Sequence, residues 1–375
     1  MNQEALIDIF RDLHAHPELG MEEYRTTARI LEVLRAHDIC TLDTGLKTGV
    51  IAVIGGRSAP SGRVIGLRCD MDALPIQEES GLEYASRVPG VMHACGHDLH
   101  TAVMLGAALL LKEQESSLPG TVKVIFQPSE ENDRGGRAMV GTGLLEDVEE
   151  FFAIHSYPAF ESGTLGIREG PVMAAPDRFR IVIHGRGTHA AQPYKGTDPI
   201  PAAATLALAC QNILTRSLDP FIPAVLSVTH VEAGNTWNVV PEEALLEGTV
   251  RTLHAEAREL IRSSLARMAE STAQTYGCTS EFFWTEGSPA VINDVGLCAY
   301  ARELALSMGF RVDRQENTMG GEDFSQYLRH APGVFIRVGT GGSYPSHHPR
   351  FTVDPSAIFP AAQFFARLAA LRLGV

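Results

Sequence analysis

The sequence predicts an α/β protein in which a helix-covered, mostly parallel sheet is interrupted by an inserted α+β domain. About the first 160 of the 375 residues alternate between short apolar runs and stretches with a period near 3.6 residues. Strands that are apolar on both faces and separated by helices are typical of a parallel sheet. From about residue 177 the expected order becomes βαββαβ, which is the order of a ferredoxin-like unit.

The first part of the chain supplies three helices and four strands. Helical periodicity covers residues 3–14, 23–37 and 99–115. Strand-like runs cover residues 49–54, 63–69, 121–127 and 150–156. The turn GGRSAPSG at 55–62 joins two of these strands directly, which predicts an antiparallel pair there.

The second part of the chain predicts the inserted domain and the return to the first. The expected strands are 178–185, 224–232, 244–252 and 279–285, and the expected helices are 198–216 and 254–276. The α/β pattern then resumes with helices at 294–308, from Asp323 and at 356–372, and with a strand at 333–339.

The chain is longer than one hydrophobic core usually supports, so two domains are expected. We place a catalytic domain at 1–175 and 288–375 and an inserted lid or dimerisation domain at 176–287. A cleft between such domains is a favoured place for a small-molecule ligand.

Composition excludes several classes of partner. The net charge is −14 and no run of Lys or Arg occurs, so nucleic acid is not expected as a partner. No segment approaches the roughly 18 to 20 apolar residues of a membrane span, and the first ten residues do not resemble a signal peptide. Six scattered cysteines in mostly apolar segments indicate reduced thiols. We therefore expect a soluble cytoplasmic protein without membrane or nucleic-acid partners.

The densest group of metal-binding side chains is HACGHDLH at 93–100, with three of the 14 histidines and one of the six cysteines. Cys95 and His97 lie two residues apart before a predicted helix, where the helix dipole favours a thiolate. Alternatively, Cys95 packs in the core, Asp98 caps the helix and the histidines lie at the surface. The density of ligand types favours a metal site.

Three further segments place similar side chains after predicted strands: Glu130 and Glu131, His155, and the pair His347 and His348. Open α/β sheets bind ligands at the carboxyl ends of their strands, so these residues are expected at one edge. Taken singly, paired glutamates indicate a solvated loop and a lone histidine indicates a structural residue. The glycine-rich loop before His347 is a weak candidate for a phosphate cradle, because no P-loop lysine follows it.

Together the four segments predict a centre for two divalent ions. They offer sulfur, nitrogen and oxygen donors, a mixture that suits zinc or manganese. Five protein ligands exceed the need of one tetrahedral ion, so two ions bridged by Cys95 or a carboxylate are expected. Glu130 is then left as the general base.

Several motifs resemble one known family in order and over nearly the whole chain: RCDMDALPI (68–76), HACGHDLHTA (93–102), PSEEN (128–132), GTHAAQP (187–193), GTDPI (196–200), NVVP (238–241), EGTVRT (247–252), GGEDFSQY (320–327) and HHPRF (347–351). The family is the aminoacylase/carboxypeptidase family of dinuclear metallohydrolases, and the branch is that of hippurate and indole-acetyl-amino-acid hydrolases. The resemblance implies an enzyme, a metal-dependent amidohydrolase that cleaves N-acyl amino acids to a carboxylic acid and a free amino acid. It also implies two divalent metal ions per subunit (Mn²⁺ or Zn²⁺).

The resemblance further implies a role for residues at matching positions. The metal ligands would be Cys95, His97, Glu131, His155 and His347, the last chosen over His348 by the family pattern of His, any residue, Pro. Glu130 would be the acid and base, and Asp70 would orient a ligand histidine. Arg68 stands where many relatives have a histidine, which leaves the choice between zinc and manganese open.

In the inserted domain the resemblance implies groups that act on the substrate. His189 would reach the site of a partner subunit to stabilise the oxyanion, which requires a homodimer or higher homo-oligomer. Asn238 and Arg251 would hold the substrate carboxylate. Trp237, beside Asn238, is expected to pack within the lid rather than line a pocket.

Other functions compete with this hypothesis. A dipeptidase or carboxypeptidase, or an N-acetyl-diaminopimelate deacetylase, would use the same dinuclear centre. A binding protein built on an inactive scaffold would bind acylated amino acids without turnover. A structural α/β protein would bind no metal.

Overall fold

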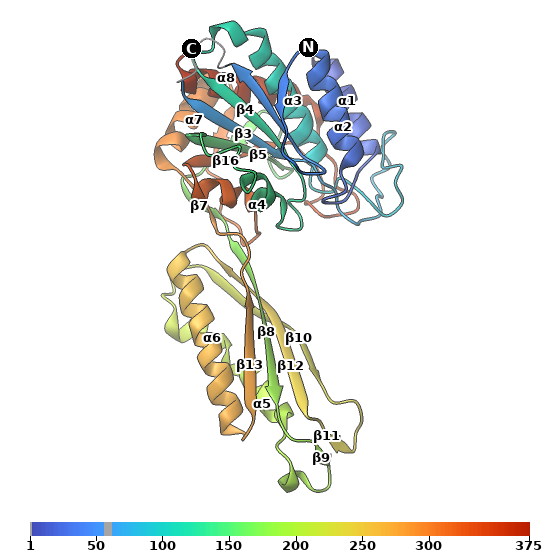
Figure 1. The fold of residues 1–375 in the computed structure, drawn as a ribbon, viewed down its shortest axis with the longest axis vertical. Helices are drawn as coiled ribbons and strands as arrows, with labels where there is room; N and C mark the ends of the chain where they lie inside the picture. The colour runs from blue at the N-terminus through green and yellow to red at the C-terminus, as the bar shows by residue number, and fades with distance from the viewer. Residues whose placement is uncertain (1, 56–61) are drawn as a thin grey trace. The chain divides into compact units, whose positions relative to one another are not determined.

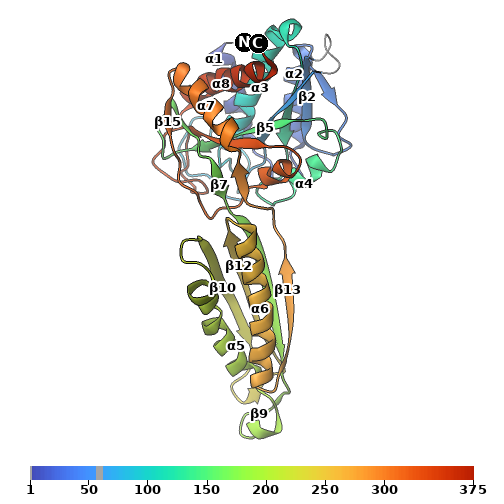
Figure 2. The same cartoon turned by 90° about the vertical axis from the view of Figure 1, so that its left-hand side faces the viewer.

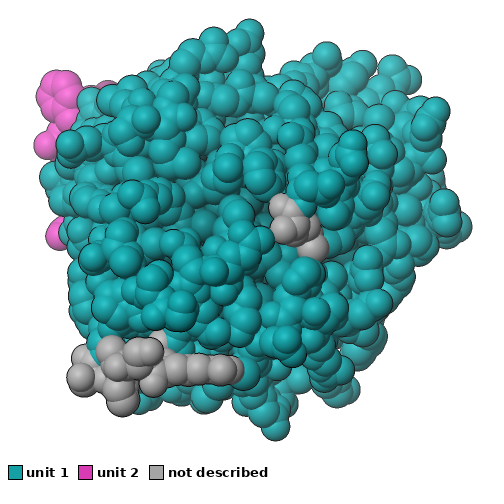
Figure 3. All heavy atoms as spheres, turned by 90° about the horizontal axis from the view of Figure 1, so that it is seen from above, with its two compact units in different colours: residues 1–170, 292–316, 323–375 teal, residues 171–291, 317–322 magenta. Residues whose placement is uncertain are grey.

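The computed structural model describes residues 2–55 and 62–375. Its ribbon is drawn in two views (Figure 1 and Figure 2). The described residues form two compact units, which Figure 3 distinguishes by colour. Unit 1 comprises Met1–Gly170, Ile292–Glu316 and Asp323–Val375, and unit 2 comprises Pro171–Val291 and Asn317–Glu322. The role of the second unit as a lid or dimerisation domain stays a prediction.

Unit 1 is built on an eight-stranded sheet. Its strands, in spatial order, are β1 (Cys40–Leu42), β2 (Val50–Gly55), β4 (Thr121–Gln127), β3 (Val64–Asp70), β5 (Glu150–Tyr157), β16 (Gly333–Gly339), β6 (Thr164–Gly166) and β15 (Arg311–Asp313). The four central strands, β4, β3, β5 and β16, are mutually parallel. The expected mostly parallel α/β sheet is therefore confirmed.

Five helices share one hydrophobic core with the sheet: α1 (Gln3–Ala15), α2 (Tyr24–Ala36), α3 (His97–Glu113), α7 (Val295–Ser307) and α8 (Ile358–Leu373). Alternate side chains of each strand point into this core, as Ile65, Leu67 and Cys69 of β3 do. The residues that alternate with them, among which are Arg68 and Asp70, point to the opposite face of the sheet. That face is packed by the short helices η4 (Asp323–Arg329) and α4 (Gly135–Val140).

One expectation about this sheet is wrong. Strands β2 and β3 do not pair with each other, because β4 lies between them, antiparallel to β2 and parallel to β3. The crossover through α3 returns the chain beside β3 and takes the edge that β2 would have needed. The turn that was expected to join the pair falls at residues 56–61, outside the described residues.

Unit 2 carries a four-stranded antiparallel sheet. Its spatial order is β10 (Ala224–Ala233), β12 (Glu243–Thr252), β8 (Ala175–His184) and β13 (Thr279–Thr285). Helices α5 (Pro199–Ala209) and α6 (Ala255–Thr275) cover one face and share a core with it. The chain order of these elements is the predicted βαββαβ.

Short elements were not predicted from periodicity, because two to four residues show no repeat. They include β1, β6 and β15 of the large sheet, the ribbon of β9 (Thr188–His189) with β11 (Val239–Val240), and the pair β7 (Gly170–Met173) with β14 (Val291–Asn293). No helix among the described residues is long and apolar enough to cross a membrane.

Candidate metal centre

The centre lies where the parallel strands of unit 1 end. Strands β3, β4, β5 and β16 run in the same direction, so their carboxyl ends meet at one edge of the sheet. Helix α3 begins at His97, two residues after Cys95. The fold thus brings together four segments that are separated by tens of residues in the sequence.

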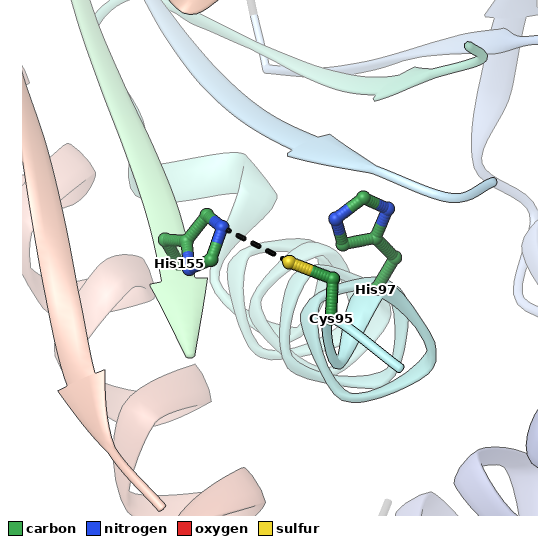
Figure 4. Close-up of side chains that lie close together, drawn as sticks. All are labelled: Cys95, His97 and His155. Carbon is green, nitrogen blue, oxygen red and sulfur yellow. Dashed lines mark hydrogen bonds between the residues drawn. The ribbon is translucent and has the colours of Figure 1, made fainter. Parts of the chain in front are cut away.

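A first group of ligand atoms comes from Cys95, His97 and His155, which lie within 4.8 Å of one another (Figure 4). The Cys95 Sγ is 3.5 Å from His155 Nε2. The Nδ1 of His155 donates to the carbonyl oxygen of Ser156 at 2.7 Å. This bond fixes the ring so that Nε2 faces the sulfur.

A second group comprises Cys95, Glu131 and His347. The Nε2 of His347 is 3.3 Å from Glu131 Oε1. His348 is engaged elsewhere, since its Nδ1 accepts the backbone N–H of Arg350 at 3.0 Å and its ring stacks on Tyr344. The structure therefore places His347, and not its neighbour, beside the other ligand atoms.

A third group, His97, Glu130 and Glu131, joins the first two. The Nε2 of His97 lies 3.9 Å from Glu131 Oε1. Cys95, His97 and Glu131 each belong to two of the three groups. Such shared donors are what a pair of neighbouring ions would need.

Asp72 orients this centre, although it is not among the residues that the sequence predicts. Its Oδ1 lies 3.2 Å from His97 Nδ1, and its two oxygens accept the backbone N–H groups of Glu130 and Glu131, both at 3.1 Å. Asp70, which was expected to orient a ligand histidine, lies 3.8 Å from His97 Nε2 through Oδ2 and binds Nδ1 of His100 at 2.5 Å through Oδ1. The signal for Asp72 was its place two residues after Asp70 in the same motif.

His100 is positioned close to the centre, but both of its ring nitrogens are already used. Asp70 binds Nδ1, and Nε2 accepts the backbone N–H of Ser156 at 2.6 Å. Burial, which outweighs the attraction of Asp70, lowers the pKa of His100 to about 4. His100 therefore connects β3 to β5 as a neutral ring rather than offering a lone pair to an ion.

Arg68 fixes the position of Asp70 beneath the centre. Its fully buried guanidinium donates to Asp70 at 3.0 Å, Asp323 at 2.8 Å and the side-chain oxygen of Gln127 at 2.9 Å. Burial alone would raise the pKa of Asp70, yet the charges of His97 and Arg68 hold it well below its usual range. Asp70 is therefore an ionised carboxylate inside the protein.

The electrostatics of the centre favour a cation. Burial would raise the pKa of Cys95, but the nearby His155 and His97 lower it well below its usual range. Hydrogen bonds to Cys95 and Glu131 raise the pKa of His347 to about 10. The anionic side chains thus hold protons on neighbouring imidazoles, in the place where a divalent ion would bind.

Two buried atoms support the same conclusion. Among the described residues, His97 Nε2 has no hydrogen-bond partner, and Glu131 Oε1 has only the ion pairs with His347 Nε2 at 3.3 Å and His97 Nε2 at 3.9 Å. Unpaired buried polar atoms are costly and call for a ligand. Thiolate, imidazole and carboxylate donors around these two atoms fit divalent zinc or manganese.

Local backbone geometry holds the ligand loops in place. Gly96 has φ 85°, and a Cβ there would lie 2.7 Å from Ser156 Oγ, so only glycine fits between Cys95 and His97. Ser129, before Glu130, has φ 53°, a conformation that is uncommon for a residue with a side chain. Its N–H donates to Glu23 Oε1 at 2.8 Å, which stabilises this strained turn.

Helix α1 also contacts the start of helix α3. His14 Nδ1 lies 2.6 Å from Asp98 and its Nε2 lies 3.1 Å from Glu78, and all three side chains are buried. Burial lowers the pKa of His14, but the bonds to the two carboxylates prevail and raise it to about 9. A charged imidazole therefore connects α1, the loop at Glu78 and the residue after His97.

The remaining expected site residues lie in unit 2. His189 is exposed at the end of β9, and its Nδ1 accepts the N–H of Ala191 at 3.0 Å. The backbone oxygen of Asn238 accepts the N–H of Ala190 at 3.0 Å, which connects the segment that follows His189 to the segment at Asn238.

Two further expected residues of unit 2 lie elsewhere in its sequence. Arg251 donates from Nε to Thr249 Oγ1 at 3.0 Å. Trp237, which was expected to pack in the lid, is 91% exposed.

Comparisons with known proteins agree with the geometry. Residues 66–371 match the family described as peptidase family M20/M25/M40. The chain is 46% identical over 369 residues to N-acetylcysteine deacetylase of Bacillus subtilis, covering 98% of this chain and 97% of that protein. It is 36% identical over 376 residues to thermostable carboxypeptidase 1 of Saccharolobus solfataricus, covering 98% and 95%. A crystal structure of a dinuclear metal-binding M20 peptidase from B. subtilis superposes with a TM-score of 0.90 at 44% identity, covering 99% and 98%.

Proposed function

This chain belongs to peptidase family M20/M25/M40, and from that membership we propose that it hydrolyses N-acyl amino acids to a carboxylic acid and a free amino acid. It is an amide-cleaving hydrolase that acts on small molecules. The observation that carries the proposal is the cluster of metal-binding side chains with Glu130 inside it. N-acetylcysteine, named for the 46% identical relative, is itself an N-acyl amino acid.

The donor groups suggest how this chain would hold two divalent ions. Cys95, His97 and His155 would help to hold one ion, and Cys95, Glu131 and His347 would help to hold the other. The relative with a dinuclear metal site supports this count. We favour zinc over manganese, because a thiolate and three imidazoles are softer donors than manganese prefers.

When bound, the ions would polarise the amide carbonyl and make a water molecule more acidic. Glu130 would accept a proton from that water on its carboxylate and pass it to the nitrogen of the leaving amine. Asp72 supports this role, because it fixes the backbone N–H of Glu130. Proton transfer of this kind requires the carboxylate to stay within hydrogen-bond reach of the water.

His189 would donate a hydrogen bond to the oxyanion. Its Nδ1 accepts the N–H of Ala191, so the neutral ring carries its proton on Nε2. The substrate's carboxylate would bind the guanidinium of Arg251. The side-chain amide of Asn238 would also donate to this carboxylate. The Oδ1 of Asn238 accepts from Thr236 Oγ1 at 3.2 Å, which leaves the Nδ2 of Asn238 to donate.

Unit 2 is the candidate lid and dimerisation domain in this proposal. It exposes Phe221 and Trp237, each 91% accessible, together with Leu208 at 79%. Large apolar side chains on a surface are typical of a contact with another protein. A homodimer through unit 2 would cover such side chains. A cytoplasmic location is also proposed, and the five buried thiols, Cys69, Cys95, Cys210, Cys278 and Cys298, suit a reducing compartment.

A panel of substrates tests the proposal. The enzyme, loaded with zinc or manganese, is assayed on N-acetylcysteine, hippurate, indole-acetyl-alanine, N-acetyl-diaminopimelate and dipeptides. Metal-dependent cleavage of the simple N-acyl amino acids is the expected result. A strict requirement for a free α-amino group would instead identify a dipeptidase. Binding without turnover of any compound would identify an inactive scaffold.

A carboxypeptidase is the second candidate, because a 36% identical relative carries that name. Both reactions cleave an amide next to a free α-carboxylate, so Arg251 serves either. Acylated dipeptides separate them: a carboxypeptidase releases the last residue from these faster than it cleaves a simple N-acyl amino acid.

A further inference from the structure

The four-stranded sheet of unit 2 has one face packed under helices and one open face. Phe179, Ile181 and Val250 point into the helix-covered core. The residues that alternate with them, including Arg178 on β8 and Arg251 on β12, point to the open face. Arg178 is exposed and Arg251 is half-buried.

The two guanidinium groups share one short stretch of this face. Arg178 lies directly opposite Thr249 in the register of β8 and β12. Arg251 donates from Nε to Oγ1 of that same Thr249 at 3.0 Å, so its side chain extends along its own strand toward Arg178. Burial and then the positive charge of Arg178 lower the pKa of Arg251, which agrees with their proximity.

The other charged residues on this face have partners of opposite sign. His184 pairs with Glu243 at 2.9 Å and with Glu281 at 3.5 Å. His230 and Arg180 pair with Glu247, at 3.0 and 3.7 Å, and His230 also lies 3.8 Å from Glu232. The face is therefore neutralised over most of its length.

Arg178 and Arg251 differ from these neighbours. Among the described residues neither has a carboxylate oxygen within 4.0 Å of its guanidinium nitrogens. The nearest acid in sequence, Asp177, points to the helix side, where it binds Arg258. Asp177 attracts Arg251, but the two adjacent guanidinium groups repel each other, and no carboxylate among the described residues forms an ion pair with either. A bound anion would remove that repulsion.

We propose that Arg178 and Arg251 form a two-guanidinium site that selects substrates with two carboxylates. Arg251 binds the α-carboxylate of the N-acyl amino acid, and Arg178 binds the carboxylate of an acidic side chain. The inference rests on the proposed function and adds to it a preference for N-acyl derivatives of aspartate and glutamate. Thr249 holds Arg251 in place, and each guanidinium offers paired donors that match a carboxylate.

Paired substrates test the assignment. The kcat/KM of the wild type and of Arg178→Gln is measured on N-acetylglutamate and on N-acetylglutamine, which has the same shape without the second charge. We expect the wild type to prefer N-acetylglutamate. Arg178→Gln should lower kcat/KM for N-acetylglutamate by roughly tenfold or more, and leave N-acetylglutamine unchanged. Arg180→Gln is the matched control, because it removes an arginine from the same face that is already paired with Glu247.

The results distinguish a failure of the two-guanidinium site from a failure of the proposed amidohydrolase function. An equal loss on both substrates would show that the two arginines share one carboxylate, and an unchanged Arg178→Gln would show that this residue does not meet the substrate. Either result overturns the inference while the amidohydrolase function stands. If the wild type cleaves no N-acyl amino acid in the presence of metal, the proposed function itself fails and the inference fails with it.

Discussion

Hydrogen bonds hold two histidine rings and part of the backbone of the candidate centre. The carbonyl of Ser156 fixes the ring of His155, and Asp72 fixes that of His97. Asp72 also holds the backbone of Glu130 and Glu131. The donor atoms are thereby positioned before an ion arrives, which reduces the cost of ordering them on binding.

Glu130 gives the sharpest prediction at the scale of single residues. Glu130→Gln should keep its metal, because the ligand atoms assigned here belong to other residues, and should lose at least about 10²-fold in kcat, because the amide accepts no proton. Metal content by elemental analysis and steady-state kinetics are measured on the same sample. Retention of most of the kcat would remove Glu130 from the role of general base.

The adjacent histidines His347 and His348 give a matched comparison of two variants. His347→Ala should lower metal affinity by roughly tenfold or more, because it removes a donor beside Glu131. His348→Ala should leave metal affinity within about twofold, since that ring is bound to the backbone of Arg350. Competition with a chromogenic chelator measures both variants. The opposite order of effects would reassign the ligand to His348.

At the scale of secondary structure, the long elements could be predicted and the contacts between them could not. Helices such as α6 and strands such as β4 show their period clearly, and their limits lie within a few residues of the predicted ones. The position of β4 between β2 and β3 depends on the crossover through α3, which local periodicity does not record. The role of Asp72 depends on its distance to His97, which only the folded chain sets.

The contact between α1 and α3 predicts a pH-dependent stability. The folded pKa of His14, about 9, exceeds its ordinary value of 6.5. The contribution of His14 is therefore complete below about pH 6.5 and is lost as pH rises through 9. The difference between the folded pKa and the ordinary pKa of His14 corresponds to roughly 3 kcal/mol of unfolding free energy.

Urea unfolding of the wild type and of His14→Gln between pH 6 and 10 measures this contribution. The stability difference between the two proteins should be largest near pH 6 and should shrink toward pH 10. His16→Gln is the control at a partly exposed histidine, and it should cost less than about 1 kcal/mol throughout. A stability difference for His14→Gln that grows with pH would contradict the assignment of a charged His14.

At the scale of the whole molecule, the parallel sheet assembles the centre from distant parts of the chain. Strands β3, β4, β5 and β16 deliver their carboxyl ends to one edge, which is why motifs from residue 70 to residue 347 meet there. This gathering could be predicted from the sequence, because it follows from strand direction alone. Strand direction does not distinguish the two neighbouring histidines; the family pattern picks His347, which has a positive φ of 69° in the structure.

The proposed dimer leads to a complementation test. Neither Glu130→Gln nor His189→Ala alone should be active. If His189 acts on the site of the partner subunit, a mixed dimer contains one complete site, so an equal mixture should recover about a quarter of the wild-type activity. The mixture is unfolded and refolded together, and each variant is treated alone as the control. No recovery in a verified mixed dimer would show that His189 acts within its own subunit.

Metal titration of the metal-free enzyme shows whether hydrolysis depends on a dinuclear centre. The protein is stripped with a chelator and then assayed on N-acetylcysteine while zinc or manganese is added in fractions of an equivalent. Hydrolysis should be absent without metal and should rise until about two equivalents per chain are bound. Hydrolysis that persists in the metal-free protein, or that saturates at one equivalent, would contradict a dinuclear centre built on Cys95.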